Sequence, residues 1–252
     1  MTTVEMIGIG LAGIVVGLIS VTAGGGTLVG IPLLMVIGLN PYAAIATNKF
    51  AIIGSFVTGS ITYRQGGVTN DRSLKLMAII ALFGSLIGAN LVFAIEMQTL
   101  KIIVVGLLTI VLVITCMGNR MQVMPDISQP ITKQAQMFGF AVIFLLSIYS
   151  GFFGAGFGTF LIFTLIYIYK LNFVRSAAVM NAINLIVVGT AVLIFAIRGG
   201  INYSVGIPLA IGATIGGALG AHFAVVKGSR AIKLLFIAMT TVLILKLLND
   251  LF

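Results

Sequence analysis

The amino-acid sequence predicts an all-α membrane protein, a polytopic bundle of transmembrane helices built from two repeats. Of its 252 residues, 60% are hydrophobic and only 8% are charged, and the mean hydropathy is +1.24. A soluble domain of this length has no core large enough to bury so much apolar surface. Two further observations support the prediction: the apolar residues fall into ten segments, and features of the first five segments recur in the second five.

Pro, Gly, Asn and charged residues mark the ends of these segments. They cover residues 4–22, 27–38, 42–63, 72–93 and 98–117 in the first half, and 134–151, 158–169, 174–197, 203–225 and 229–248 in the second. A helix needs about 20 apolar residues to cross a bilayer, and eight segments are near that length. The second segment of each half is shorter, and forms either a tilted short helix or one arm of a re-entrant hairpin.

The domain organisation follows from this division. We expect a first transmembrane repeat at residues 1–117 and a second at residues 134–252. The polar stretch between them, residues 118–133, is predicted to be a cytoplasmic linker.

A glycine cluster at the start of each short segment is the clearest sign of duplication. The chain reads Ala23-Gly24-Gly25-Gly26-Thr27 in the first half and Gly154-Ala155-Gly156-Phe157-Gly158-Thr159 in the second. Glycine breaks helices, and a break inside a bilayer is tolerated only where it lines a cavity or is packed in protein. A duplicated break predicts a duplicated half-site, which is typical of transporters. The alternative is that these glycines only permit close helix packing.

Other features recur in the same order and support an internal duplication. They are Leu39-Asn40 with Leu171-Asn172, Asn48 with Asn181, Gly66-Gly67 with Gly199-Gly200, and Gly84 and Gly88 with Gly216 and Gly220. The spacing of the last set is typical of close contacts between membrane helices.

The basic residues predict that the two repeats are inverted. The net charge is +9, from 14 Lys and Arg against 5 Asp and Glu. Basic loops face the cytoplasm. The loop after the third segment is basic in the first half. In the second half the corresponding loop has only Arg198, and the basic loops are the ones before the third segment and after the fourth. We therefore expect a multi-pass protein of the cell inner (plasma) membrane, with two inverted repeats of five segments and both termini outside the cytoplasm.

Lys49 lies about two turns into the third segment, where a charge is unusual. A buried ammonium is costly and is normally paired or functional, and no Asp or Glu lies in a segment interior. Its counter-ion could therefore be an anionic substrate. The alternative is a lysine whose ammonium reaches the outer interface.

The helix starts at the two glycine breaks favour the same kind of ligand. Their N-terminal N–H groups carry partial positive charge and would point into the protein. We predict that these ends converge and that an anion binds among Gly24, Gly25, Gly26, Thr27, Asn48, Lys49, Gly156, Gly158, Thr159 and Asn181.

Several other activities are disfavoured by the residues that the chain lacks. One Cys and one His cannot form a metal cluster or a disulfide framework, so we expect no metal, no cofactor, no catalytic residues and no enzymatic activity. The lack of carboxylates inside the segments disfavours a cation pathway. The expected partners are a small anion and the lipid bilayer, with a homodimer possible; scattered basic residues argue against nucleic acid.

The stretch from Gly17 to Phe50 resembles the TauE/SafE family through Gly24-Gly25-Gly26-Thr27, Pro32-Leu33-Leu34 and Ala46-Thr47-Asn48. The Gly66-Gly67 pair and the second copy, from Ser150 to Leu248, also fit. The second copy departs from the pattern, because Val179-Met180-Asn181 replaces Ala46-Thr47-Asn48 and no lysine follows.

This resemblance implies an exporter of sulfite or of an organosulfonate such as sulfoacetate. We expect it to work by alternating access at a midplane site between the repeats. An anion channel and a transporter of small carboxylates are the alternatives.

Overall fold

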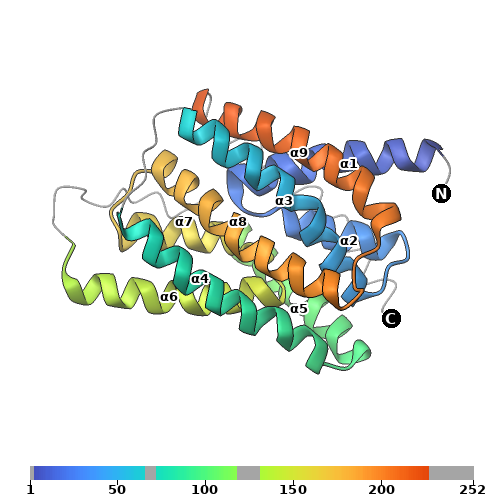
Figure 1. Ribbon diagram of the computed structural model, residues 1–252, viewed down its shortest axis with the longest axis horizontal. Helices are drawn as coiled ribbons and strands as arrows, with labels where there is room; N and C mark the ends of the chain where they lie inside the picture. Colours follow the sequence, from blue (N-terminus) through green and yellow to red (C-terminus); the bar gives the residue numbers. More distant parts are fainter. Residues whose placement is uncertain (1–2, 66–71, 118–130, 227–252) are drawn as a thin grey trace.

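The computed structural model describes residues 3–65, 72–117 and 131–226, and within these ranges every regular element is a helix. The elements are α1 (Thr3–Ala23), α2 (Gly26–Val36), α3 (Pro41–Gln65), α4 (Arg72–Leu91), the 3-10 turn η1 (Val92–Ala94), α5 (Met97–Met117), α6 (Lys133–Phe152), α7 (Phe157–Tyr167), α8 (Phe173–Ile197) and α9 (Tyr203–Val226) (Figure 1). Each α-helix matches one predicted segment within a few residues. The predicted segment 229–248 and the Gly66-Gly67 pair lie outside the described residues.

Six of the described helices are long and apolar enough to cross a membrane. Their apolar stretches are Thr3–Thr22, Pro41–Gln65, Leu74–Ala94, Lys133–Phe152, Arg175–Ile197 and Tyr203–Phe223. The expected long helix for the fifth segment is present as α5, which has 21 residues, Met97–Met117. The two predicted short helices are confirmed: α2 and α7 have 11 residues each. At about 1.5 Å per residue, neither crosses a bilayer core of about 30 Å by itself.

The first and fourth helices of each half pack against the other half. α1 packs along α9, and α6 packs along α4. A Cβ at Gly88 would overlap the α6 backbone at Ile148, and a Cβ at Gly216 would overlap the α1 backbone at Ile14. The predicted role of these spaced glycines in close helix packing is therefore confirmed. The other extensive helix–helix contacts are those of α3 with α9, α3 with α8, and α4 with α8 (Figure 1).

Corresponding helices of the two halves run in opposite directions. In three contacting pairs of helices, residues later in one helix contact residues later in the other, so the two helices of each pair are parallel. These pairs are α1 with α9, α3 with α9, and α4 with α6. α3 and α8 are antiparallel, because Tyr42 at the start of α3 packs against Phe195 near the end of α8, with 6.2 Å between ring centroids. α4 and α8 are parallel, because Ser85 contacts Val187 and Asn90 contacts Arg198. Hence α1, α3 and α9 run one way, and α4, α6 and α8 run the other (Figure 1).

Matching residues of the two halves also have matching structural roles. Gly24 and Gly156 adopt left-handed φ angles of +66° and +73°, a conformation that favours glycine. Asn40 and Asn172 cap the starts of α3 and α8. Their side-chain oxygens accept hydrogen bonds from the backbone N–H three residues later, at 2.8 and 2.9 Å, which is the usual role of Asn before a helix.

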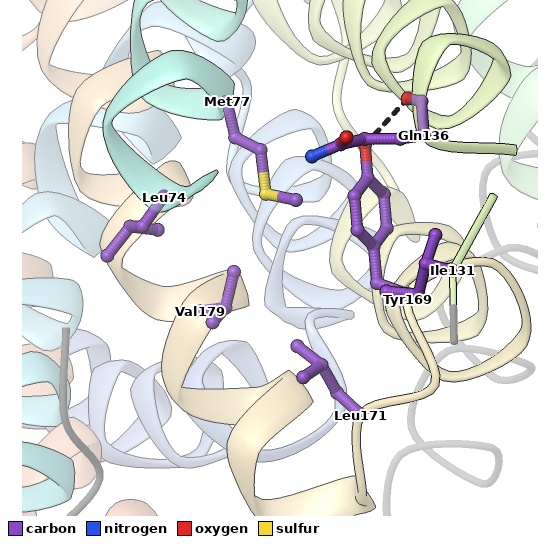
Figure 2. A pocket seen from close by; sticks show the side chains of 7 residues that line it. All are labelled: Leu74, Met77, Ile131, Gln136, Tyr169, Leu171 and Val179. Carbon is purple, nitrogen blue, oxygen red and sulfur yellow. Dashed lines mark hydrogen bonds between the residues drawn. The ribbon is translucent and has the colours of Figure 1, made fainter. Parts of the chain in front are cut away.

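The loops of the bundle gather at two ends. At one end, the starts of α4 and α6 and the α7–α8 loop enclose a cavity of about 60 Å³ (Figure 2), lined by Leu74, Met77, Ile131, Gln136, Tyr169, Leu171 and Val179. The basic residues Lys75, Lys133, Lys170 and Arg175 belong to these segments. None of the residues that line this cavity is a predicted site residue.

At the other end, the end of α8 lies beside the α4–α5 connection. The Arg198 guanidinium stands over the Phe93 ring, 4.4 Å from its centroid, and donates a hydrogen bond to Asn90 Oδ1 at 3.3 Å. The α7–α8 loop and the starts of α4 and α6, which were predicted to be cytoplasmic, thus lie at one end, and the α4–α5 connection and the end of α8, which were predicted to be external, lie at the other.

Candidate functional site

The glycine breaks of the two halves touch each other. Gly24 lies directly against Gly158, so that a Cβ on either residue would overlap the backbone of the other. Both glycines are buried. The contact brings the α1–α2 break and the α6–α7 break together, which is the convergence that the sequence predicted.

Each break contains the end of one helix and the start of the next. α1 ends at Ala23 and α2 begins at Gly26, while α6 ends at Phe152 and α7 begins at Phe157. A helix start carries partial positive charge and a helix end carries partial negative charge. The two partial charges at each break therefore oppose one another. The positive field that we expected from the starts of α2 and α7 is offset by the ends of α1 and α6.

Thr27 and Asn48 form a polar pair beside the first break. Asn48 Nδ2 donates to Thr27 Oγ1 at 3.4 Å, and both side chains are buried. Asn48 Oδ1 lies close to Gly30, where any side chain would overlap it. Among the described residues this oxygen has no hydrogen-bond partner. A buried acceptor without a donor costs free energy, so a ligand that offers a donor would be favoured here.

Lys49 reaches from α3 to the second break. The residue is only 1% exposed, and its Nζ donates to the backbone carbonyl of Ser150 in the last turn of α6. Such a carbonyl has no partner within its own helix, and the helix dipole favours a cation beside it. Nζ also lies 3.2 Å from the position of a Cβ at Gly154. The alternative interpretation, in which the ammonium reaches the outer interface, is therefore wrong.

Among the residues whose side chains the structure describes, Lys49 is the one buried charged side chain. The two carboxylates of this described part, Glu5 and Glu96, are exposed. The ammonium is thus held by a neutral backbone carbonyl and the dipole of α6 rather than by an ion pair.

Asn181 makes the corresponding contact from the other half. Its Nδ2 donates to the carbonyl of Val21, in the last turn of α1, at 3.1 Å, and to the carbonyl of Ala177 at 2.8 Å. Its Oδ1 has no hydrogen-bond partner in the part of the chain that the structure describes. Lys49 and Asn181 therefore each connect the third helix of one half to the end of the first helix of the other.

The remaining predicted residues flank these contacts. Gly25 and Gly26 are buried at the start of α2, and Gly156 precedes α7 in a buried position. Thr159, in the first turn of α7, is half-buried. The structure therefore gathers the predicted residues around the two breaks, and Thr159 is the most exposed of them.

Sequence reasoning did not assign two partners in this region, Ser150 and Gly154, to the site. Ser150 contributes its backbone carbonyl, a group that every residue has, so no residue type marks it in the sequence. Gly154 has a left-handed φ of +83° and stands two residues before Gly156. It was recognised as the first residue of the second glycine cluster but not as a contact of Lys49.

Comparisons with known proteins extend over nearly the whole chain. A model of the family described as Sulfite exporter TauE/SafE matches residues 9–247. The chain is 28% identical over 238 residues to the probable membrane transporter protein YfcA of Escherichia coli (strain K12), which covers 93% of this chain and 86% of that protein. No solved structure matches the chain significantly.

Two further relatives agree with this result. A probable membrane transporter protein of Haemophilus influenzae is 27% identical over 241 residues, covering 94% of this chain and 92% of that protein. The probable membrane transporter protein ORF9 of Sinorhizobium sp is 28% identical over 242 residues, covering 95% and 91%. With six helices able to span a membrane and a family match over residues 9–247, this chain belongs to the TauE/SafE family of membrane transporters.

Proposed function

We propose that this transporter exports a small anion, most simply sulfite or an organosulfonate such as sulfoacetate. The observation that carries the proposal is Lys49, a buried amine at the place where two glycine breaks meet, with no carboxylate beside it in the described part of the chain. A charge inside a membrane protein is expensive and marks an ion or substrate pathway more often than not. The family description names sulfite, which supports a sulfur oxyanion.

The mechanism that we propose is alternating access between two inverted repeats. Opposite directions of corresponding helices support the inversion. The helix contacts gather α1, α3 and α9 into one group and α4, α6 and α8 into another, which supports a movement of one group against the other. Transporters of this kind bind their substrate at broken helices between the repeats.

A carrier is favoured over a channel by the burial of the site. Nine of its ten predicted residues are buried, so an ion reaches them only if the surrounding helices move. An open anion pore would leave such side chains in contact with water.

The distribution of basic residues supports a plasma-membrane location and indicates which end of the bundle faces the cytoplasm. Basic residues concentrate at the end of the bundle that holds the starts of α4 and α6. Because basic loops face the cytoplasm, this end is proposed to lie inside the cell, in the plasma membrane, with both termini outside. Transport without chemical change of the substrate, rather than enzymatic activity, is part of the same proposal.

Counterflow in proteoliposomes tests this function. Purified protein is reconstituted, and uptake of labelled sulfite, sulfoacetate, taurine, thiosulfate or lactate is measured against the same unlabelled anion inside. We expect saturable exchange of at least one sulfur oxyanion. Lactate exchange alone would favour a carboxylate transporter, ohmic single-channel currents would favour a channel, and no flux of any anion would overturn the proposal.

Lys49→Met tests the direct role of the amine. Loss of a buried charged partner costs about 2–5 kcal/mol, so we expect exchange to fall at least about tenfold. Lys75→Met is the matched control, because Lys75 is exposed at the end of the bundle. Unchanged exchange in Lys49→Met would refute a role for this amine in binding the substrate.

A further inference from the structure

Among the described residues, the net charge of the site comes from one group. Lys49 is the one buried charged side chain among those that the structure describes. The helix ends add little, because each break places a helix end beside a helix start and their partial charges oppose one another. The described residues therefore offer at most one positive charge to a ligand at the breaks.

The other polar atoms around the breaks do not favour additional negative charge. The oxygens Asn48 Oδ1 and Asn181 Oδ1 are buried without a hydrogen-bond partner among the described residues. The carbonyl oxygen of Ser150 already accepts from Lys49. All three are acceptors, so they repel an oxyanion and favour a ligand that carries a hydrogen-bond donor such as a hydroxyl group.

We infer that the site selects anions with a single negative charge and excludes dianions of the same size. Buried charge must be neutralised by a partner. One ammonium balances one negative charge, and a dianion would leave the second uncompensated in a site that presents acceptor oxygens. This inference rests on the proposed function and narrows it: among the sulfur oxyanions, bisulfite and hydroxysulfonates are transported, whereas the dianions sulfate and sulfoacetate are excluded, although the broader proposal includes sulfoacetate.

The test compares two pairs of anions matched in size. Isethionate and methanesulfonate carry one charge, and their partners sulfoacetate and sulfate carry two. Exchange of each is measured at equal concentration in proteoliposomes, with the membrane potential held at zero by potassium and valinomycin so that the field does not separate the pairs. Because an unpaired buried charge is costly, we expect the monoanion of each pair to exchange at least about tenfold faster.

The outcomes separate the two proposals. Equal or faster exchange of the dianions would overturn the charge selection while leaving an anion transporter in place. No exchange of any of the four anions would overturn the proposed function and this inference together.

Two variants separate charge from structure at Lys49. Lys49→Gln keeps an N–H donor for the Ser150 carbonyl but has no positive charge, so every anion leaves one more buried charge uncompensated. We therefore expect exchange of the monoanions to fall and the dianions to stay the slower member of each pair. Lys49→Arg keeps the charge, and we expect it to retain the wild-type ratio. Unchanged monoanion exchange in Lys49→Gln would show that the charge of Lys49 does not set the selection.

Discussion

Two polar residues with equivalent positions in the two halves differ in charge. Lys49 of α3 donates to Ser150, two residues before the end of α6, and Asn181 of α8 donates to Val21, two residues before the end of α1. In the sequence Asn181 aligns with Asn48, yet by contact its counterpart is Lys49. One half therefore supplies a positive charge, and the other a neutral amide that holds a helix end.

At the residue scale, we predict that Asn181 mainly stabilises the fold. Asn181→Leu has a similar size but leaves the Val21 carbonyl without its donor, so we expect a loss of about 1–3 kcal/mol in the free energy of unfolding. This loss of stability is measured by thermal unfolding of the purified protein in detergent. Asn90→Leu is the control, because Asn90 is exposed: its amide donates within its own helix at 2.9 Å, and its Oδ1 accepts a solvent-exposed hydrogen bond from Arg198 at 3.3 Å, which contributes less than a buried one. An equal loss in both variants would contradict the prediction.

Among the elements, the contact between the breaks depends on glycine at specific positions. The α1–α2 and α6–α7 breaks approach through backbone atoms at Gly24 and Gly158. A left-handed φ at Gly24 adds a conformational reason to the steric one. The other short-range glycine contacts, between α4 and α6 and between α1 and α9, join straight helices and need only the absence of a side chain.

Gly158→Ala tests this contact. Its Cβ would overlap Gly24 and stand 3.1 Å from Met180 Sδ, so the two breaks must move apart. Overpacking of this kind costs about 1–3 kcal/mol, and we expect both the unfolding temperature and the anion exchange rate to fall. Gly106→Ala is the matched control: no atom lies within 4 Å of a Cβ there, and alanine favours the helix by up to about 1 kcal/mol. Equal behaviour of the two variants would mean that the breaks tolerate separation.

For the whole molecule, the opposite directions of corresponding helices determine which loops share a side. The exposed residues Lys75 and Arg175 belong to one end of the bundle, and Arg198 belongs to the other. A membrane that surrounds the helices must separate these ends.

Single cysteines at Lys75, Arg175 and Arg198, placed in a Cys116→Ser background, test the orientation. We expect an impermeant thiol reagent added to whole cells to label the cysteine at position 198, and to reach positions 75 and 175 only after the membrane is opened. Positive charge in loops is retained on the cytoplasmic side, which is the reason for this expectation. Labelling of positions 75 and 175 from opposite sides would rule out the inverted arrangement.

Local features of the sequence were sufficient to locate the elements. Asn40 and Asn172 were recognised as recurring residues and prove to cap α3 and α8. Helix ends depend on nearby residues such as Gly and Asn, so they can be predicted from a short window of sequence. The Ser150 carbonyl could not be predicted, because its role depends on which side chain from another helix comes close to it.

The sequence by itself determined that this protein is a helical membrane transporter with two broken helices and an unusual charge at Lys49, because hydropathy, glycine and charge act along the chain. Only the tertiary structure decided that Gly24 meets Gly158, that Lys49 binds the end of α6, and that helix ends oppose helix starts at each break. Those facts depend on how distant helices pack, and packing is determined by the shapes of surfaces that residues far apart in the chain build together.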